Sequence, residues 1–207
     1  TVGLATYWGV YTEAQKLFRH AAEDRYLGTA AAAAGAEQRA AALKELDDDA
    51  RSAIGRTEMA AMFLVSIGSG IGLLSFGPIS IRIGRRGAFA LFCLAGLASA
   101  LTLFLVLPHG PLKWAALPVF GCFATGMHAG YAVYFPELFP TRVRGTGGGF
   151  CFNGGRFVAS PTLLLSGWLV SSGMPIAHAA SLLSLLYLLG IAVLIVAPET
   201  KGKDLPT

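Results

Sequence analysis

The chain of 207 residues is 54% hydrophobic and only 14% charged, with a mean hydropathy of +0.59. This composition is more apolar than that of a soluble globular domain and predicts a protein of the lipid bilayer. The net charge of +4 comes from short basic clusters between apolar runs and not from a continuous basic face, so nucleic acid is excluded as an expected partner.

The first apolar run covers residues 1–18 and is shorter than the roughly 20 residues that a membrane-spanning helix needs. The chain opens at Thr1 without a charged segment and cleavage site, so this run is predicted to be the end of a truncated transmembrane helix. Tyr7 and Trp8 are candidate substrate-binding residues on it. Packing or interfacial anchoring is the alternative for aromatic side chains of this kind.

Residues 19–56 are rich in alanine and in charges of both signs, and are therefore too polar to enter lipid. We predict a polar external insertion that is partly helical, because residues 36–54 contain many helix formers and carry apolar residues such as Ala50 and Ile54 at helical spacing. The insertion is either a lid or partner-docking element, or a solvated segment without a functional role.

Five transmembrane helices are predicted within residues 57–198. Their apolar runs cover residues 59–81, 87–107, 114–135, 146–170 and 176–197. Short turns connect several of them, with the sequences "RIGRR", "PHGPLK" and "SSGMP".

Small residues recur at helical spacing on three of these runs. They are Gly68, Gly70 and Gly72 on the first run, Gly126 and Gly130 on the third, and Gly145, Gly149, Gly155 and Ala159 on the fourth. Lipid supplies no hydrophobic force between helices, so close contact through small residues holds such bundles together. The sequence therefore predicts a closely packed bundle of several helices.

The basic residues of the short connections predict the orientation in the membrane, because Lys and Arg there are retained on the cytoplasmic side. One side collects Arg82, Arg85, Arg86, Arg142, Arg144, Lys201 and Lys203, whereas Lys113 alone falls in the short connections opposite. Residues 199–207 are therefore expected to be a cytoplasmic tail. The chain is expected to be a multi-pass integral protein of the cell (inner) membrane.

Two charged residues are unusual in these surroundings. Glu137 is the only acidic residue between Met59 and Pro198, and it stands at the end of an apolar run. Arg156 lies 11 residues beyond Gly145, which at about 1.5 Å per residue places it ~16 Å into the membrane. A charge near the middle of the bilayer predicts a functional site.

Asn153 precedes Arg156 by three residues on the same helical face. The two side chains are suited to binding a carboxylate or another polar group, because the guanidinium fork matches a carboxylate. The alternative is that Arg156 pairs with a helix carbonyl or with an acidic residue outside this chain. Tyr131, on the preceding run, is a further substrate-binding candidate, with packing as its alternative role.

Catalytic and metal-binding patterns are not found in the sequence. It offers no nucleophile–base pair and no paired intramembrane carboxylates, and its cysteines, Cys93, Cys122 and Cys151, lack metal-ligand spacing. We therefore expect no enzyme, no cofactor and no metal site.

Three motifs carry a resemblance to a known family. "RIGRR" lies between the second and third helices, "PELFPTRVRG" between the fourth and fifth, and "PETKGKDLP" after the last. With six helices in this order, the chain resembles the C-terminal half of a major facilitator superfamily transporter, similar to the sugar-porter and metabolite/proton-symporter branches. One departure is Ile81, which stands where the family commonly has an Asp before the first Arg of the loop motif.

The resemblance implies an all-α, six-helix bundle with a truncated first helix, forming one half of a twelve-helix carrier. It implies secondary active transport of a small polar metabolite, a sugar or a carboxylate, by alternating access, with a possible coupling proton and a missing N-terminal six-helix half as partner. It also implies that Glu137 faces Arg82, Arg85, Arg86 and Arg144 in a cytoplasmic gate. The alternative function is a channel component or a membrane-embedded interaction subunit.

Overall fold

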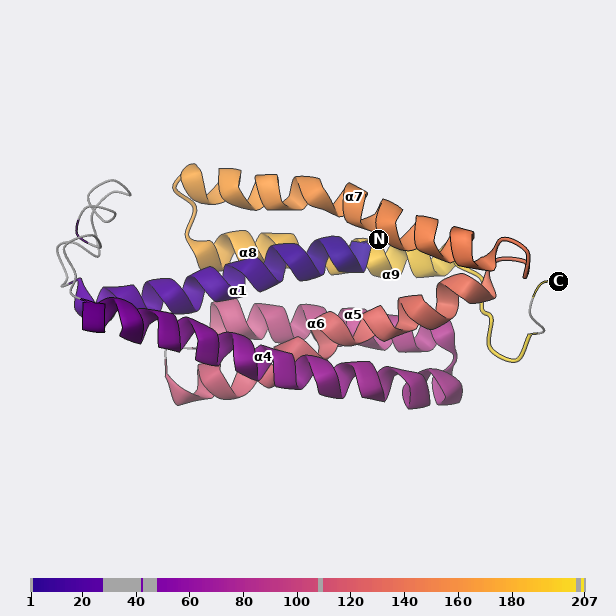
Figure 1. Cartoon of the computed structure of the whole chain (residues 1–207), viewed down its shortest axis with the longest axis horizontal. Helices are drawn as coiled ribbons and strands as arrows, with labels where there is room; N and C mark the ends of the chain where they lie inside the picture. Colours follow the sequence, from indigo (N-terminus) through magenta and orange to yellow (C-terminus); the bar gives the residue numbers. More distant parts are fainter. Residues whose placement is uncertain (1, 28–41, 43–47, 108–109, 204–205, 207) are drawn as a thin grey trace.

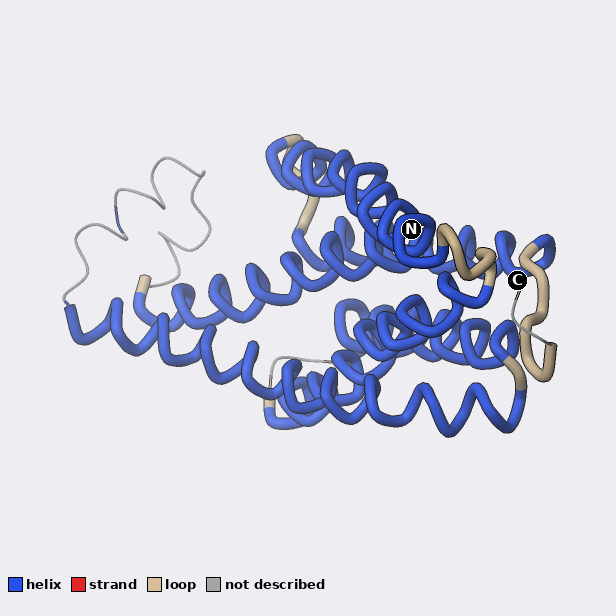
Figure 2. The backbone as a smooth tube through the Cα atoms, turned by 45° about the vertical axis from the view of Figure 1, so that its right-hand side comes forward, coloured by secondary structure: helices blue, strands red, loops and turns tan. Residues whose placement is uncertain are grey.

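A computed structural model describes residues 2–27, 42, 48–107, 110–203 and 206, and leaves the side chains of residues 2–13 and of Val158 undescribed. Every regular element in the described part of the chain is a helix (Figures 1 and 2). The helices are α1 (Val2–Tyr26), α4 (Asp48–Ile83), α5 (Arg85–Leu101) with the π-helical turn η1 (Thr102–Val106), α6 (Pro111–Glu137), α7 (Arg144–Ser171), α8 (Ile176–Ser184) and α9 (Leu186–Val196).

The helices run back and forth between two ends of an elongated bundle (Figure 1). One end holds the turn between α4 and α5, the connection from α6 to α7 and the segment after α9, and we call it the C-terminal end. The opposite end holds the end of α1, the start of α4 and the start of α6. The three motifs that carry the family resemblance therefore meet at one end, as the sequence predicted.

Within the described residues, three helical stretches are long and apolar enough to cross a membrane: Asp48–Ile83, Arg85–Val106 and Ile176–Val196. They coincide with three of the five predicted spans. The other two predicted spans lie in α6 and α7, which have 27 and 28 residues but contain many glycines together with His128 and Arg156. Such residues lower the mean hydropathy, so membrane crossing by α6 and α7 stays a prediction.

The segment that connects α1 to α4 is shorter than the polar insertion predicted over residues 19–56. Helix α1 continues to Tyr26 and α4 already begins at Asp48, so both ends of the insertion prolong the flanking helices. Polar side chains join α1 to α4 beside these extensions, with Gln15 donating to Glu58 at 2.5 Å and Arg19 lying 3.9 Å from Glu58. Most of the predicted helix over residues 36–54 lies outside the described residues.

The closest helix packing joins α4 to α6 through glycines. A Cβ atom on Gly68 would lie 1.8 Å from the backbone oxygen of Pro118, and one on Gly72 would lie 2.0 Å from that of Cys122. The prediction of close contact through small residues is confirmed for Gly68 and Gly72. It is wrong for Gly70 on α4 and for Gly145 and Gly149 on α7, because a Cβ atom at any of these positions would meet nothing within 4 Å.

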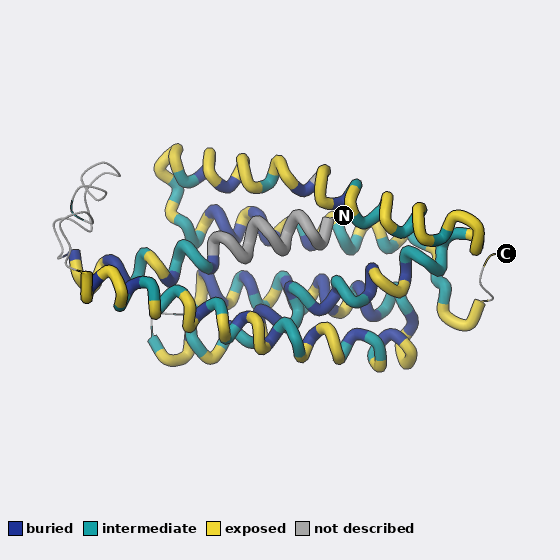
Figure 3. Tube along the Cα trace, in the orientation of Figure 1, coloured by how far each residue is buried: buried dark blue, intermediate teal, exposed yellow. Residues whose placement is uncertain are grey.

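Buried side chains form two clusters along the bundle. Phe18, Val65, Leu103 and Phe120 belong to the cluster toward the opposite end. The cluster toward the C-terminal end is richer in aromatic residues, and includes Phe76, Phe89, Phe92, Tyr131, Tyr134 and Tyr187. By contrast, much of the surface of α7 is exposed (Figure 3).

Candidate functional site

An ion pair at the C-terminal end joins Arg85, the first residue of α5, to Glu137, the last residue of α6. The Nη2 atom of Arg85 donates to Oε1 of Glu137 at 2.8 Å, and its Nε atom donates to Oε2 at 3.2 Å. Both side chains are only 17% exposed. This two-pronged geometry matches the guanidinium fork to the carboxylate and fixes the relative position of the two helix ends.

Two hydroxyl groups complete the surroundings of this ion pair. The hydroxyl of Thr200 donates to Oε2 of Glu137 at 2.5 Å, and Nη1 of Arg85 donates to the hydroxyl of Ser80 at 2.9 Å. Ser80 belongs to the last turn of α4 and Thr200 to the segment after α9. The pair thus connects the ends of α4, α5 and α6 with the C-terminal segment.

Glu199 caps the start of α5 from a distant part of the sequence. Its Oε1 accepts the backbone N–H of Arg85 at 2.9 Å, and its Oε2 accepts that of Arg86 at 3.0 Å. These are free N–H groups of the first helical turn, where the helix dipole also favours a negative charge. The same carboxylate accepts the backbone N–H groups of Thr200 and Lys201.

The two carboxylates have pKa values below the ordinary value. For Glu137, burial alone raises the pKa, but hydrogen bonds from Arg85 and Thr200 outweigh it and lower the pKa. For Glu199, burial also raises the pKa, and the four backbone hydrogen bonds, from Lys201, Arg85, Arg86 and Thr200, outweigh it. Both side chains are therefore held in the charged form at neutral pH.

Further hydrogen bonds hold the C-terminal segment against the helix ends. The hydroxyl of Tyr134 donates to the backbone oxygen of Pro198 at 2.6 Å, and Nζ of Lys201 donates to that of Arg82 at 2.7 Å. These hydrogen bonds and those of Glu199 and Thr200 join residues 198–201 to the ends of α4, α5 and α6. We call Arg85, Glu137, Glu199 and Thr200 the charge network.

The predicted gate residues all lie at this end, but Glu137 has an ion pair with only Arg85 among the described residues. Arg82 contributes its backbone oxygen, and the side chain of Arg86 donates to the backbone oxygen of Ile195. Arg144 donates to the backbone oxygen of Pro136 at 3.1 Å, and the expected contact with Glu137 is not formed. The α6 carbonyls lack helical partners at the helix end, which explains why they capture this guanidinium.

Arg156 and Asn153 both lie on the exposed side of α7. The guanidinium carbon of Arg156 lies 4.7 Å from the centre of the Phe152 ring, a cation–π contact within its own helix. The amide of Asn153 donates to the backbone oxygen of Gly149 at 3.0 Å. In the described part of the chain Arg156 has no ion pair, and the hydrogen bond of Asn153 stays within α7.

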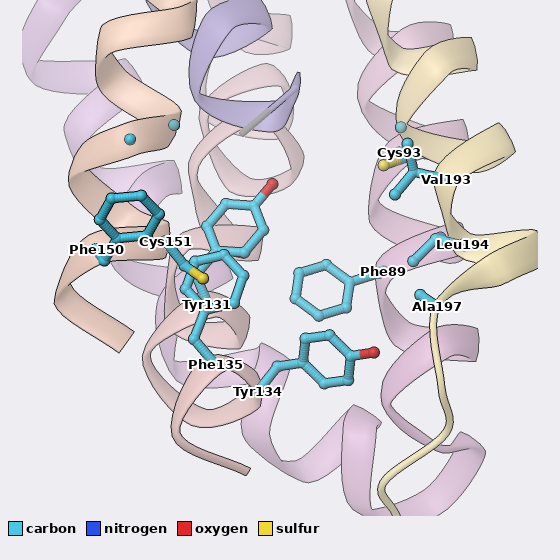
Figure 4. A pocket seen from close by; sticks show the side chains of 13 residues that line it. Phe89, Cys93, Tyr131, Tyr134, Phe135, Phe150, Cys151, Val193, Leu194 and Ala197 are labelled. Atoms are coloured by element: carbon cyan, nitrogen blue, oxygen red, sulfur yellow. The ribbon is translucent and has the colours of Figure 1, made fainter. Parts of the chain in front are cut away.

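Tyr131, on α6, is buried within aromatic packing. Its ring stacks on Phe89 and on Phe135, with ring centres 5.2 and 5.3 Å apart. It lines a largely apolar cavity of about 480 Å³ between α5, α6, α7 and α9, which Figure 4 shows with Cys93 and Cys151 on facing walls. The packing role considered for Tyr131 therefore has direct support. The side chains of Tyr7 and Trp8 lie outside the described residues.

Sequence reasoning missed two members of the charge network, Glu199 and Thr200. Glu137 is the only acidic residue between Met59 and Pro198, and Glu199 lies one position beyond that region. Glu199 and Thr200 belong to the motif "PETKGKDLP", which carries part of the family resemblance. A signal was nevertheless available, because an acidic residue directly after an apolar run stands at the same helix ends as the basic residues of "RIGRR".

No protein-family profile and no solved structure matches the chain. It is 32% identical, over 135 residues, to a protein of Haemophilus influenzae described as a metabolite transport protein; the match covers 65% of this chain and 33% of the relative. It is 29% identical, over 143 residues, to a protein of Cupriavidus pinatubonensis described as a 4-methylmuconolactone transporter, covering 68% of this chain and 33% of the relative. The chain thus spans about a third of the length of these relatives. The resemblance to transport proteins carried by the motifs is confirmed as a partial match.

Proposed function

On the premise that this chain is a partial relative of metabolite transporters, we propose that it forms one half of a major facilitator carrier. The complete carrier moves a small polar metabolite, a sugar or a carboxylate, across the cell (inner) membrane by alternating access, with a proton as the coupling ion. The C-terminal end of the bundle faces the cytoplasm. In carriers of this architecture two six-helix halves enclose a substrate site near the middle of the membrane.

The observation that carries the proposal is the Arg85–Glu137 ion pair and its connection to Glu199 and Thr200. It links the ends of three helices and the C-terminal segment by side chains that are charged at neutral pH. In the proposed cycle the charge network forms in one state of the carrier and opens in the other. A network present in only one of two states shifts their populations by the free energy of its contacts.

The exposed side of α7 supports a substrate-facing role for Arg156 and Asn153. An arginine in the middle of a span is too costly to leave in lipid, so such residues face a bundle interior or an aqueous cavity. Arg156 has no acidic partner in the described residues, and its exposed side chain lies over the ring of Phe152. In the proposed carrier its guanidinium and the amide of Asn153 face the cavity between the halves, where they bind a carboxylate or hydroxyl group.

Uptake measurements test the proposal. Cells that express the complete carrier containing this chain are supplied with labelled monocarboxylates, lactones and sugars, and accumulation is followed with and without a proton gradient. Saturable accumulation that depends on the gradient is expected. The alternative functions predict other results, because a channel component conducts without saturable accumulation and an interaction subunit moves nothing by itself.

A further inference from the structure

The end of the bundle opposite the charge network holds a small cavity that no part of the proposed transport cycle uses. It has a volume of about 170 Å³ and lies where the last turns of α1, the start of α4 and the start of α6 come together (at the left of Figure 1). One water molecule takes about 30 Å³ in the liquid, so the cavity has room for a small ion with some of its water. Its polar lining includes Lys113, Arg25, Asp24 and Thr57.

Lys113 is the unusual member of this lining. It is only 4% exposed, and within the described residues its ammonium group has no hydrogen bond and no ion pair. Burial lowers the pKa of Lys113. A lysine that is this little exposed and has no hydrogen bond or ion pair within the described residues is unfavourable in its charged form, and proteins resolve this by pairing the charge or by removing its proton.

The surroundings favour a negative ion as the missing partner. Arg25 adds a second positive side chain, and the start of the 27-residue helix α6 adds the positive end of its dipole at Gly110. The hydroxyl of Thr57 donates its proton to the backbone oxygen of Ala53, so this proton is already used within α4. Among the lining residues that the structure describes, Asp24 is the one carboxylate, and no ion pair joins it to Lys113 there.

We propose that this cavity is a binding site for a small inorganic anion of halide size, which pairs with the ammonium group of Lys113 and bridges α1 to α6. The bound anion supplies a partner for the ammonium group of Lys113, which has no hydrogen bond and no ion pair within the described residues. It lies at the end of the bundle remote from Glu137 and Arg85. The site therefore stabilises the junction of α1, α4 and α6 without being part of the charge network.

Trp114 lines the same cavity and provides a direct probe. The chain has three tryptophans, so the changes Trp8→Phe and Trp168→Phe leave Trp114 as the single emitter. Iodide is used as the anion because it quenches indole fluorescence, and acrylamide as the neutral quencher. The measurement uses this chain in lipid nanodiscs, with ionic strength held constant by gluconate.

We expect quenching by iodide to saturate in the millimolar range and to be reversed by chloride. Lys113→Met removes the charge but keeps a flexible apolar side chain, and should leave only weak quenching that rises linearly with iodide, at least about fivefold lower at the half-saturating concentration. Lys203→Met, which removes an exposed lysine at the other end, should behave like the unchanged protein. Acrylamide quenching should be the same in all three proteins.

Linear iodide quenching in the protein that keeps Lys113 would overturn the proposal, as would saturable quenching of equal strength after Lys113→Met. If Lys113→Met does not fold, saturation and chloride competition in the protein with Lys113 decide the question. Lys113→Arg, which keeps the positive charge, should then retain saturable quenching. Competition by phosphate but not by chloride would also contradict a site of halide size.

Discussion

The charged side chains at the C-terminal end of the bundle and those on the exposed side of α7 have opposite surroundings. At the C-terminal end, Arg85 and Glu137 are mostly buried and each has several partners within the chain. On α7, Arg156 and Asn153 are exposed, and the cation–π contact of the first and the hydrogen bond of the second stay within that helix. The first group is held in place by contacts within this chain, whereas the role that we propose for the second depends on the other half of the carrier.

The largest expected effect concerns the exposed side of α7. If it forms one wall of a substrate cavity, liposomes that contain this chain alone should show no specific uptake, because the other wall is absent. Uptake should appear when the complete carrier is reconstituted under the same conditions. Saturable accumulation by the 207-residue chain alone would show that the exposed side of α7 needs no second half.

Next in size is the effect of Glu137→Gln in the complete carrier, which breaks the charge network without changing its shape. A hydrogen bond to a charged group contributes about 1.5–3 kcal/mol, so its loss shifts a balanced two-state equilibrium by roughly tenfold or more. We expect uptake to fall by about this factor at equal surface expression. Asp48→Asn is the matched control, because it also removes one carboxylate but from a fully exposed side chain, and should leave uptake unchanged.

A smaller effect is expected for Arg156→Lys, which keeps the positive charge but removes the guanidinium fork. A carboxylated substrate should then bind about tenfold more weakly, because one of two parallel hydrogen bonds is lost. Binding of uncharged sugars should change little. Arg142→Lys, at an exposed position between α6 and α7, is the control. Unchanged affinity after Arg156→Ala would exclude contact with the substrate.

Much of the fold was predictable because a membrane-spanning helix needs a run of about 20 apolar residues, and such runs are visible in the sequence. The runs at 59–81, 87–107 and 176–197 appear as helices suited to crossing a membrane. The glycine contacts of Gly68 and Gly72 were also predictable, since small residues at helical spacing favour close approach. The same reasoning failed at Gly145 and Gly149, because spacing on one helix does not say whether another helix lies against it.

The candidate site was less predictable because its contacts join distant positions. The scarcity of acidic residues singles out Glu137, but several arginines lie at suitable positions in the sequence, and within the described residues only Arg85 forms an ion pair with it. Arg144 instead donates to backbone oxygens at and just after the end of α6. A count of charges does not show that backbone oxygens compete with Glu137 for an arginine. Glu199 acts as a helix cap from 114 positions away, and no local pattern encodes such a cap.

The smallest effect concerns the pH dependence of the charge network. Glu137 and Glu199 have folded-state pKa values below the ordinary 4.5, so their stabilising contribution is present above pH 4.5 and is lost as the pH falls through the lowered values.

Glu199→Gln removes a charged cap that contributes about 1 kcal/mol, or roughly 2–4 °C in Tm for a chain of this size. Thermal unfolding at pH 7 and at pH 3.5 should therefore show a Tm that falls with acid in the unchanged protein and falls less after Glu199→Gln. Since the exposed side of α7 carries no carboxylate, Asn153→Ala should leave this pH dependence unaltered. An equal acid effect in the Glu199→Gln and unchanged proteins would show that the cap at α5 contributes nothing to the stability of the C-terminal end.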